Sequence, residues 1–134
     1  MIVVDANILV YSLIECDHSP LIRKLREKDA DWRTAGLCLH EILNVLATYR
    51  RRDVLTLAQC KKLLEHAEHF IQAAQCEVKM DTALAVAGKY AITGYDAQYV
   101  ALAQSLNAPL ITEDRKLREA VPGIAFSMRE FLVR

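Results

Sequence analysis

Short apolar runs alternate with helical patterns along this chain, and this alternation limits the possible fold more than any other feature. Ile2 to Val4 and Pro109 to Thr112 are two such runs, each short enough for a buried strand. Strands that alternate with helices pair in parallel, because each crossover returns the chain to the same end of the sheet. We therefore predict an α/β protein: a three-layer α/β/α sandwich around a central parallel sheet of four to five short strands.

Periodicity and end signals predict the other elements. Thr56 is the predicted cap of a long amphipathic helix, and Asp81 and Asp96 are predicted caps of two later helices. Ser19 followed by Pro20 is typical of a helix start with serine as the cap. Further strands are predicted at 31–35, 76–79 and 124–126, and helices at 8–14, 21–28, 39–50, 57–74, 81–92, 96–106, 114–120 and 128–133.

Length and charge set the broad class. We expect one domain over residues 1–134, because the length suits one hydrophobic core and no linker-like stretch divides it. The chain has 17 basic and 17 acidic residues, so any contact with nucleic acid must be local. We also expect a cytoplasmic protein without membrane association, since no signal-peptide pattern occurs and no apolar stretch approaches the ~18 residues of a membrane helix.

Four acids lie where a parallel sheet is expected to carry its site. Asp5 and Asp114 follow predicted strands, while Glu41 and Asp96 lie near the starts of helices. In open parallel sheets, sites lie beyond the carboxyl ends of the strands. Each acid taken alone is better interpreted as a helix cap, because a carboxylate there accepts hydrogen bonds from backbone N–H groups.

The apolar context of these acids distinguishes them from ordinary caps. Asp5, for example, directly follows Ile-Val-Val, so partial burial is expected. Buried carboxylates that converge repel one another, and a cation between them removes the conflict. An all-oxygen site favours Mg²⁺ or Mn²⁺, and no set of cysteines and histidines has the spacing that zinc requires.

Four segments resemble the motifs of the PIN domain family, in that family's order and at its spacing. The similarity extends over essentially the whole chain, and the compact size resembles the VapC-type ribonuclease toxins of prokaryotic toxin–antitoxin pairs. A strand that ends in aspartate is common, whereas the four segments together are specific. They are Val-Val-Asp5-Ala-Asn7-Ile-Leu, Glu41-Ile-Leu-Asn44-Val-Leu, Tyr95-Asp96-Ala-Gln-Tyr-Val-Ala-Leu-Ala and Leu-Ile-Thr112-Glu-Asp114-Arg-Lys-Leu.

The resemblance implies a PIN-like fold and an endoribonuclease that depends on Mg²⁺ or Mn²⁺. Asp5 and Asp96 would hold the metal ion, and Glu41 and Asp114 would complete the catalytic pocket. We expect hydrolysis of RNA phosphodiester bonds by metal-activated water, which leaves a 5′-phosphate and a 3′-hydroxyl. The resemblance also implies a homodimer and a small antitoxin protein as partner.

Polar and basic residues beside the acids have two interpretations each. Asn7 and Thr112 match polar positions of the family motifs, and they either orient the neighbouring acids or serve as turn residues. Arg115 and Lys116 are our predicted contacts to the substrate phosphates, against the alternative of a solvated helix face.

Aromatic side chains and one histidine near the motifs are less specific. Tyr95, Tyr99 and Trp32 could stack on RNA bases, but aromatics with apolar neighbours more often belong to the core. His40 has no second and third ligand at a suitable spacing, so we interpret it as structural.

Two other classes of protein remain as alternatives. A phosphoacceptor receiver module also has an acidic pocket at its strand ends, but it needs a second acid beside the first and a lysine after the last strand; here Asp5 stands alone. The other is a catalytically silent PIN-fold module for RNA binding or assembly. Loss of an acid would favour it, yet all four are present. Incubation with RNA, with and without EDTA, separates an enzyme from a binder.

Overall fold

A five-stranded parallel sheet forms the centre of the molecule. The computed structural model describes residues 1–134, and its strand order is β3-β2-β1-β4-β5, with every neighbouring pair parallel. This confirms the predicted fold class. The strands are β1 (Ile2–Val4), β2 (Trp32–Ala35), β3 (Gln75–Cys76), β4 (Leu110–Ile111) and β5 (Ala125–Phe126).

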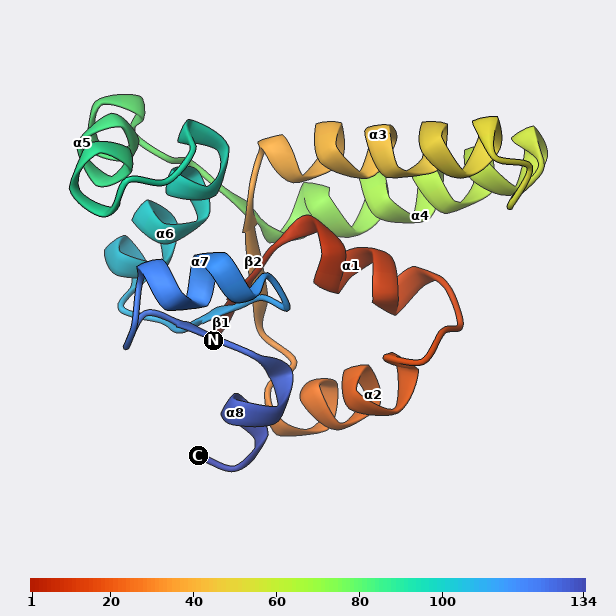
Figure 1. Cartoon of the computed structure of the whole chain (residues 1–134). Helices are drawn as coiled ribbons and strands as arrows, with labels where there is room; N and C mark the ends of the chain where they lie inside the picture. The colour runs from red at the N-terminus through yellow and green to blue at the C-terminus, as the bar shows by residue number, and fades with distance from the viewer.

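Eight helices surround the sheet (Figure 1). In the figure α3 and α4 lie side by side at the upper right and extend away from the sheet, while α5 and α6 lie at the left. No helix combines the length and the apolar composition that a membrane span requires. The helices are α1 (Ala6–Leu13), α2 (Ser19–Lys28), α3 (Leu37–Arg51), α4 (Leu57–Ala74), α5 (Met80–Tyr90), α6 (Gly94–Leu106), α7 (Arg115–Ala120) and α8 (Met128–Leu132).

Strand β1 shows why the molecule has three layers. Successive side chains of a strand point to opposite faces. Val3 belongs to a core cluster with residues of α1, α3, α4 and α6, whereas Ile2 and Val4 belong to a second cluster with residues of α2 and α8. All three side chains are 0% exposed. The continuous apolar run Ile2–Val4 therefore reflects a strand that is buried on both faces.

Several predicted helix starts are corrected by one to three residues. Thr93, not Asp96, caps α6: its hydroxyl accepts a hydrogen bond from the Asp96 backbone N–H at 3.1 Å. Asp81 lies in the first turn of α5, whose cap is Lys79, and Ser19 is the first residue of α2 rather than its cap. The Thr56 cap is confirmed, because its side chain and that of Gln59 form a capping box at the start of α4.

Candidate active site

The four acids singled out in the sequence line a single cavity of about 720 Å³. Asp5 directly follows β1 and caps α1, while Asp114 follows β4 and caps α7. Glu41 lies in α3, and Asp96 lies in the first turn of α6. Because β1 and β4 are parallel neighbours, their carboxyl ends meet at the same edge of the sheet. Residues far apart in the sequence thus share one surface.

Asp5 is the most buried of the four acids, with 9% exposure. One carboxylate oxygen accepts a hydrogen bond from the Ile8 backbone N–H at 3.1 Å, and the other accepts one from the Thr112 hydroxyl at 2.5 Å. Burial raises the pKa of Asp5 to about 6. The two hydrogen bonds oppose this change, whereas the carboxylates of Glu41 and Asp96 add to it.

The position of the Glu41 carboxylate is fixed by a hydrogen bond between two helices. The Tyr99 hydroxyl on α6 donates a hydrogen bond of 2.6 Å to Oε1 of Glu41 on α3. Burial raises the pKa of Glu41, the Tyr99 hydrogen bond lowers it, and the Asp96 carboxylate raises it. Tyr99 is 1% exposed and Trp32 is 3% exposed, so both rings belong to the protein interior, as the favoured interpretation of these aromatics predicts, and neither is free to stack on a base.

The Asp96 carboxylate interacts electrostatically with the other three acids of the cavity. Burial raises the pKa of Asp96, the Asp114 carboxylate raises it further, and a hydrogen bond from Thr93 lowers it. The four carboxylates thus repel one another in pairs: Glu41 and Asp96 each act on Asp5, Asp96 acts on Glu41, and Asp114 acts on Asp96. Such repulsion disfavours the fully ionised cavity near neutral pH unless a cation neutralises it.

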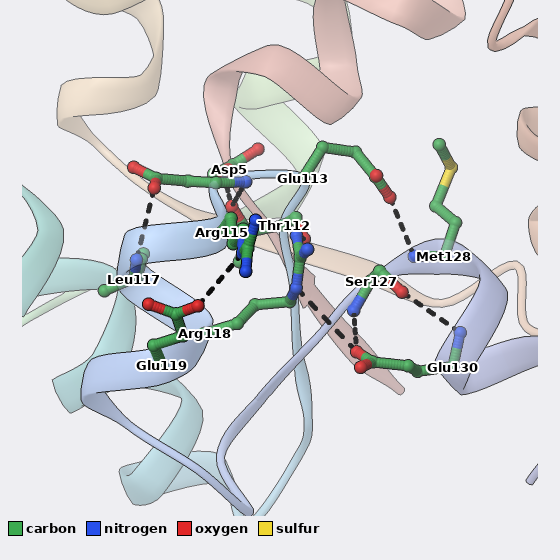
Figure 2. A network of polar contacts seen from close by, with 11 residues as sticks. Asp5, Thr112, Glu113, Arg115, Leu117, Arg118, Glu119, Ser127, Met128 and Glu130 are labelled. Atoms are coloured by element: carbon green, nitrogen blue, oxygen red, sulfur yellow. Dashed lines mark hydrogen bonds and ion pairs between the residues drawn. The ribbon is translucent and has the colours of Figure 1, made fainter.

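Thr112 bridges Asp5 and Asp114. Figure 2 shows Thr112 and Asp5 within this network of polar contacts. Its hydroxyl donates to Asp5 and accepts a hydrogen bond of 3.0 Å from the Asp114 backbone N–H. Asp114 in turn accepts a hydrogen bond of 3.1 Å from the Leu117 backbone N–H. Arg118 donates to the Thr112 carbonyl at 3.0 Å, so the backbone of this bridge is also held in place. Thr112 is 0% exposed, and water therefore cannot replace these contacts.

Of the remaining predicted site residues, one lines the cavity and two lie outside it. Asn7 is exposed and lines the cavity. Arg115 and Lys116 are exposed on α7 and do not line it. Nε of Arg115 forms an ion pair of 3.0 Å with Glu119, whereas Lys116 forms none. Of the two predicted phosphate contacts, Lys116 is therefore the one without an intramolecular partner.

The donor set of the cavity fits a hard divalent cation. All four side chains offer carboxylate oxygens, which are the ligands that Mg²⁺ and Mn²⁺ prefer. No three of them stand close enough together in the structure to enclose an ion. Asp5 instead directs both oxygens, and Glu41 and Asp114 one oxygen each, at hydrogen-bond donors of the protein. Side-chain rotation would be needed to close the set around a metal ion.

Comparison with known proteins identifies the family. The family model of the PIN domain matches residues 2–121 of the chain. The chain belongs to the PIN domain family. This confirms the resemblance seen in the four motifs. The chain is also similar to "Ribonuclease VapC3" of Pyrobaculum aerophilum, with 32% identity over 127 residues that cover 92% of this chain and 96% of that protein.

Solved structures share the PIN domain architecture found here. A crystal structure of PAE2754 from Pyrobaculum aerophilum has a TM-score of 0.75 and 28% identity, and the match covers 98% of this chain and 93% of the other. FitAcB from Neisseria gonorrhoeae gives 0.70 with 15% identity over 96% and 99% of the two chains. A toxin–antitoxin complex from Klebsiella pneumoniae gives 0.66 with 15% identity over 96% and 98%. At 15% identity, the likeness concerns the fold alone.

Part of the PIN domain cavity was not predicted from the sequence. Tyr99 was assigned to the core without its hydrogen bond to Glu41, and Asn44, Gln98 and His40 were not assigned to the site, although all three line the cavity. A signal was available, because residues three apart on a helix lie on one face. Asn44 follows Glu41 by three residues, and Tyr99 follows Asp96 by three.

Proposed function

We propose that this protein is an endoribonuclease that depends on Mg²⁺ or Mn²⁺ and is the toxin of a VapBC-type toxin–antitoxin pair. The observation that carries the proposal is the set of four carboxylates in a single cavity of a PIN domain. The relative named Ribonuclease VapC3 supports the nuclease activity. The mutual repulsion of the acids supports the metal dependence, because a bound cation would relieve it.

Each acid has a distinct proposed role. Asp5 and Asp96 would hold the metal ion. A bound Mg²⁺ or Mn²⁺ would lower the pKa of water and neutralise the charge that develops on the phosphate. Glu41 keeps Oε1 on the Tyr99 hydroxyl, which leaves Oε2 available to orient the attacking water. Asp114, across the cavity, is the second candidate for this orientation, and Asn7 and Thr112 would hold the acids in place.

Partners follow from the same proposal. The structural neighbour from Klebsiella pneumoniae is a toxin–antitoxin complex, which supports a small antitoxin as partner of this chain. We also propose a homodimer, an RNA substrate contacted by Arg115 and Lys116, and a cytoplasmic location. In this proposal residues 1–134 act as one nuclease domain. Co-purification with the product of a neighbouring small reading frame would test the pairing.

The decisive experiment measures RNA cleavage by the purified protein. We expect cleavage of an RNA panel with Mg²⁺ and none with EDTA, and we expect Asp5→Asn and Asp96→Asn each to reduce the rate by at least ~10³-fold, since both remove a metal ligand. Asp81→Asn, at an exposed position of α5, is the matched control and should retain full activity.

Two results would contradict the proposal. Full activity of folded Asp5→Asn protein would exclude the assigned metal site. Binding of RNA by the wild-type protein without cleavage, in the presence of either metal, would instead favour the catalytically silent RNA-binding module.

A further inference from the structure

Tyr95 is an exposed aromatic residue on the wall of the acidic cavity. It lies in the first turn of α6 beside Asp96, lines the same cavity and is 68% exposed. Among the five tyrosines of the chain, it is the only exposed one. Its ring takes part in none of the aromatic or cation–π contacts of the protein. A large apolar surface is thus left open directly beside a candidate metal ligand.

The structure of α6 does not require this ring. Thr93 caps the helix, and Ala97 and Val100, both 0% exposed, attach it to the core. A tyrosine at such a position has a polar hydroxyl end and an apolar face, which is the surface that single-stranded nucleic acid binding uses. A ligand that uses both the acids and the ring must carry a phosphate next to an aromatic base.

We propose that Tyr95 is a substrate-positioning residue: its ring stacks on the unpaired base next to the scissile phosphate. This inference rests on the proposed nuclease function. The acids of the cavity, with their cation, receive the phosphate, and the adjacent base then meets the Tyr95 ring. In a duplex the bases are already stacked and paired, so the ring finds no free face. Stacking tolerates any base, because every base has a π-face.

Two amide side chains of the same cavity offer contacts to the base edges. Asn44 and Gln98 line the same cavity, and the exposed Asn44 side chain forms no hydrogen bond within the protein. An amide both donates and accepts hydrogen bonds, as the edges of an unpaired base require. The cavity therefore combines a stacking surface on α6 with amide groups that can contact base edges.

The competing explanation for the exposed Tyr95 ring is that it contacts another protein chain. Met80 is 60% exposed and Leu84 is 76% exposed on α5, which packs against α6. These side chains do not line the acidic cavity. Leu84→Ala is therefore the matched control: it removes exposed apolar surface nearby and leaves the cavity wall unchanged.

The test measures RNA binding by fluorescence anisotropy with Mg²⁺ in the Glu41→Gln background, which slows cleavage and keeps the proposed metal ligands Asp5 and Asp96, using a labelled single-stranded oligonucleotide of mixed sequence. Tyr95→Leu should weaken binding by about fivefold or more, the lower limit for loss of one base–aromatic stack. Tyr95→Phe and Leu84→Ala should bind like the parent protein. A version of the oligonucleotide with abasic sites should abolish the difference between Tyr95→Leu and the parent.

A second readout uses intrinsic fluorescence of Tyr95→Trp. The chain has one tryptophan, Trp32, which is 3% exposed, so the new indole dominates any response to RNA. Quenching by single-stranded RNA, with little quenching by a duplex, is expected. Equal affinities of Tyr95→Leu and the parent would overturn this inference alone, as would dissociation of an oligomer by both Tyr95→Leu and Leu84→Ala. Absence of RNA binding and cleavage in the wild-type protein would overturn the proposed function as well.

Discussion

The strand side and the helix side of the acidic cavity are held in different ways. On the strand side, Asp5 is fixed by a backbone N–H and by Thr112, which in turn holds the backbone of Asp114. On the helix side, Glu41 is fixed by one hydroxyl group, that of Tyr99, from a neighbouring helix. The strand side is thus defined by the sheet itself, whereas the helix side depends on how α3 and α6 pack. We expect the helix side to adjust more readily around a metal ion.

The largest effect predicted for this comparison is a pH-dependent loss of stability caused by Asp5. The pKa of Asp5 is 3.8 ordinarily and about 6 in the folded protein, so the folded state holds its proton longer than the unfolded state. Protonated Asp5 therefore contributes fully to the stability of the folded state below about pH 4. This contribution is lost as pH rises through about 6, where Asp5 ionises in the folded protein. At 1.36 kcal/mol per pKa unit, this loss is about 3 kcal/mol.

Thermal melts in EDTA between pH 4 and pH 8 would measure this effect. The quantity to compare is the difference between the wild-type protein and Asp5→Asn, because both share the titration of the other groups. Above about pH 6, Asp5→Asn should be the more stable protein, and added Mg²⁺ should stabilise only the wild type. A wild-type protein that gains stability over Asp5→Asn as pH rises would contradict the assignment.

Thr112→Val tests the strand side directly. The change keeps the shape of the buried side chain but removes the donor to Asp5 and the acceptor for the Asp114 N–H. The pKa of Asp5 should rise further, since the Thr112 hydrogen bond lowers it. We expect cleavage to fall by roughly 30-fold, in line with loss of a group that orients a metal ligand.

Thr34→Val is the matched control for this change. Thr34 is also 0% exposed, and its hydroxyl donates to the Val4 carbonyl at 2.9 Å rather than to an acid. It should lower stability by about 1 kcal/mol and leave cleavage nearly unchanged. Equal losses of cleavage in both variants would mean that Thr112 acts through stability alone.

Tyr99→Phe tests the helix side and should have a smaller effect. It removes the hydroxyl group from Glu41 and keeps the ring in the core. The Tyr99 hydrogen bond lowers the pKa of Glu41, so its removal should raise that pKa and shift the acidic limb of the pH–rate profile to higher pH. We expect a loss of about tenfold in kcat near neutral pH, which is less than the ~10²-fold that loss of a general acid or base itself costs, because Glu41 is still present. An unshifted profile would exclude Glu41 as the group that must be ionised.

The same contrast explains what the sequence could predict. The positions of Asp5 and Asp114 follow from parallel strands, because a residue after a strand end must reach the sheet edge. The contact between Tyr99 and Glu41 does not follow, since the two lie 58 residues apart on helices whose relative rotation depends on packing. Local competition explains the misplaced cap of α6: Thr93 and Asp96 are both good capping residues, and the backbone selected Thr93.

The smallest predicted effect concerns the basic residues of α7, which lie outside the cavity. Lys116 is exposed on α7 without an ion pair, whereas Arg115 is paired with Glu119. Lys116→Gln should raise the KM for RNA about threefold at low salt, and the slope of log affinity against log salt should decrease by about one, as expected for one lost phosphate contact. Arg115→Gln should change both less, because its charge is already partly compensated. If neither variant alters the salt dependence, α7 lies outside the path of the RNA, and the substrate must be held by the cavity and the surface of α6 instead.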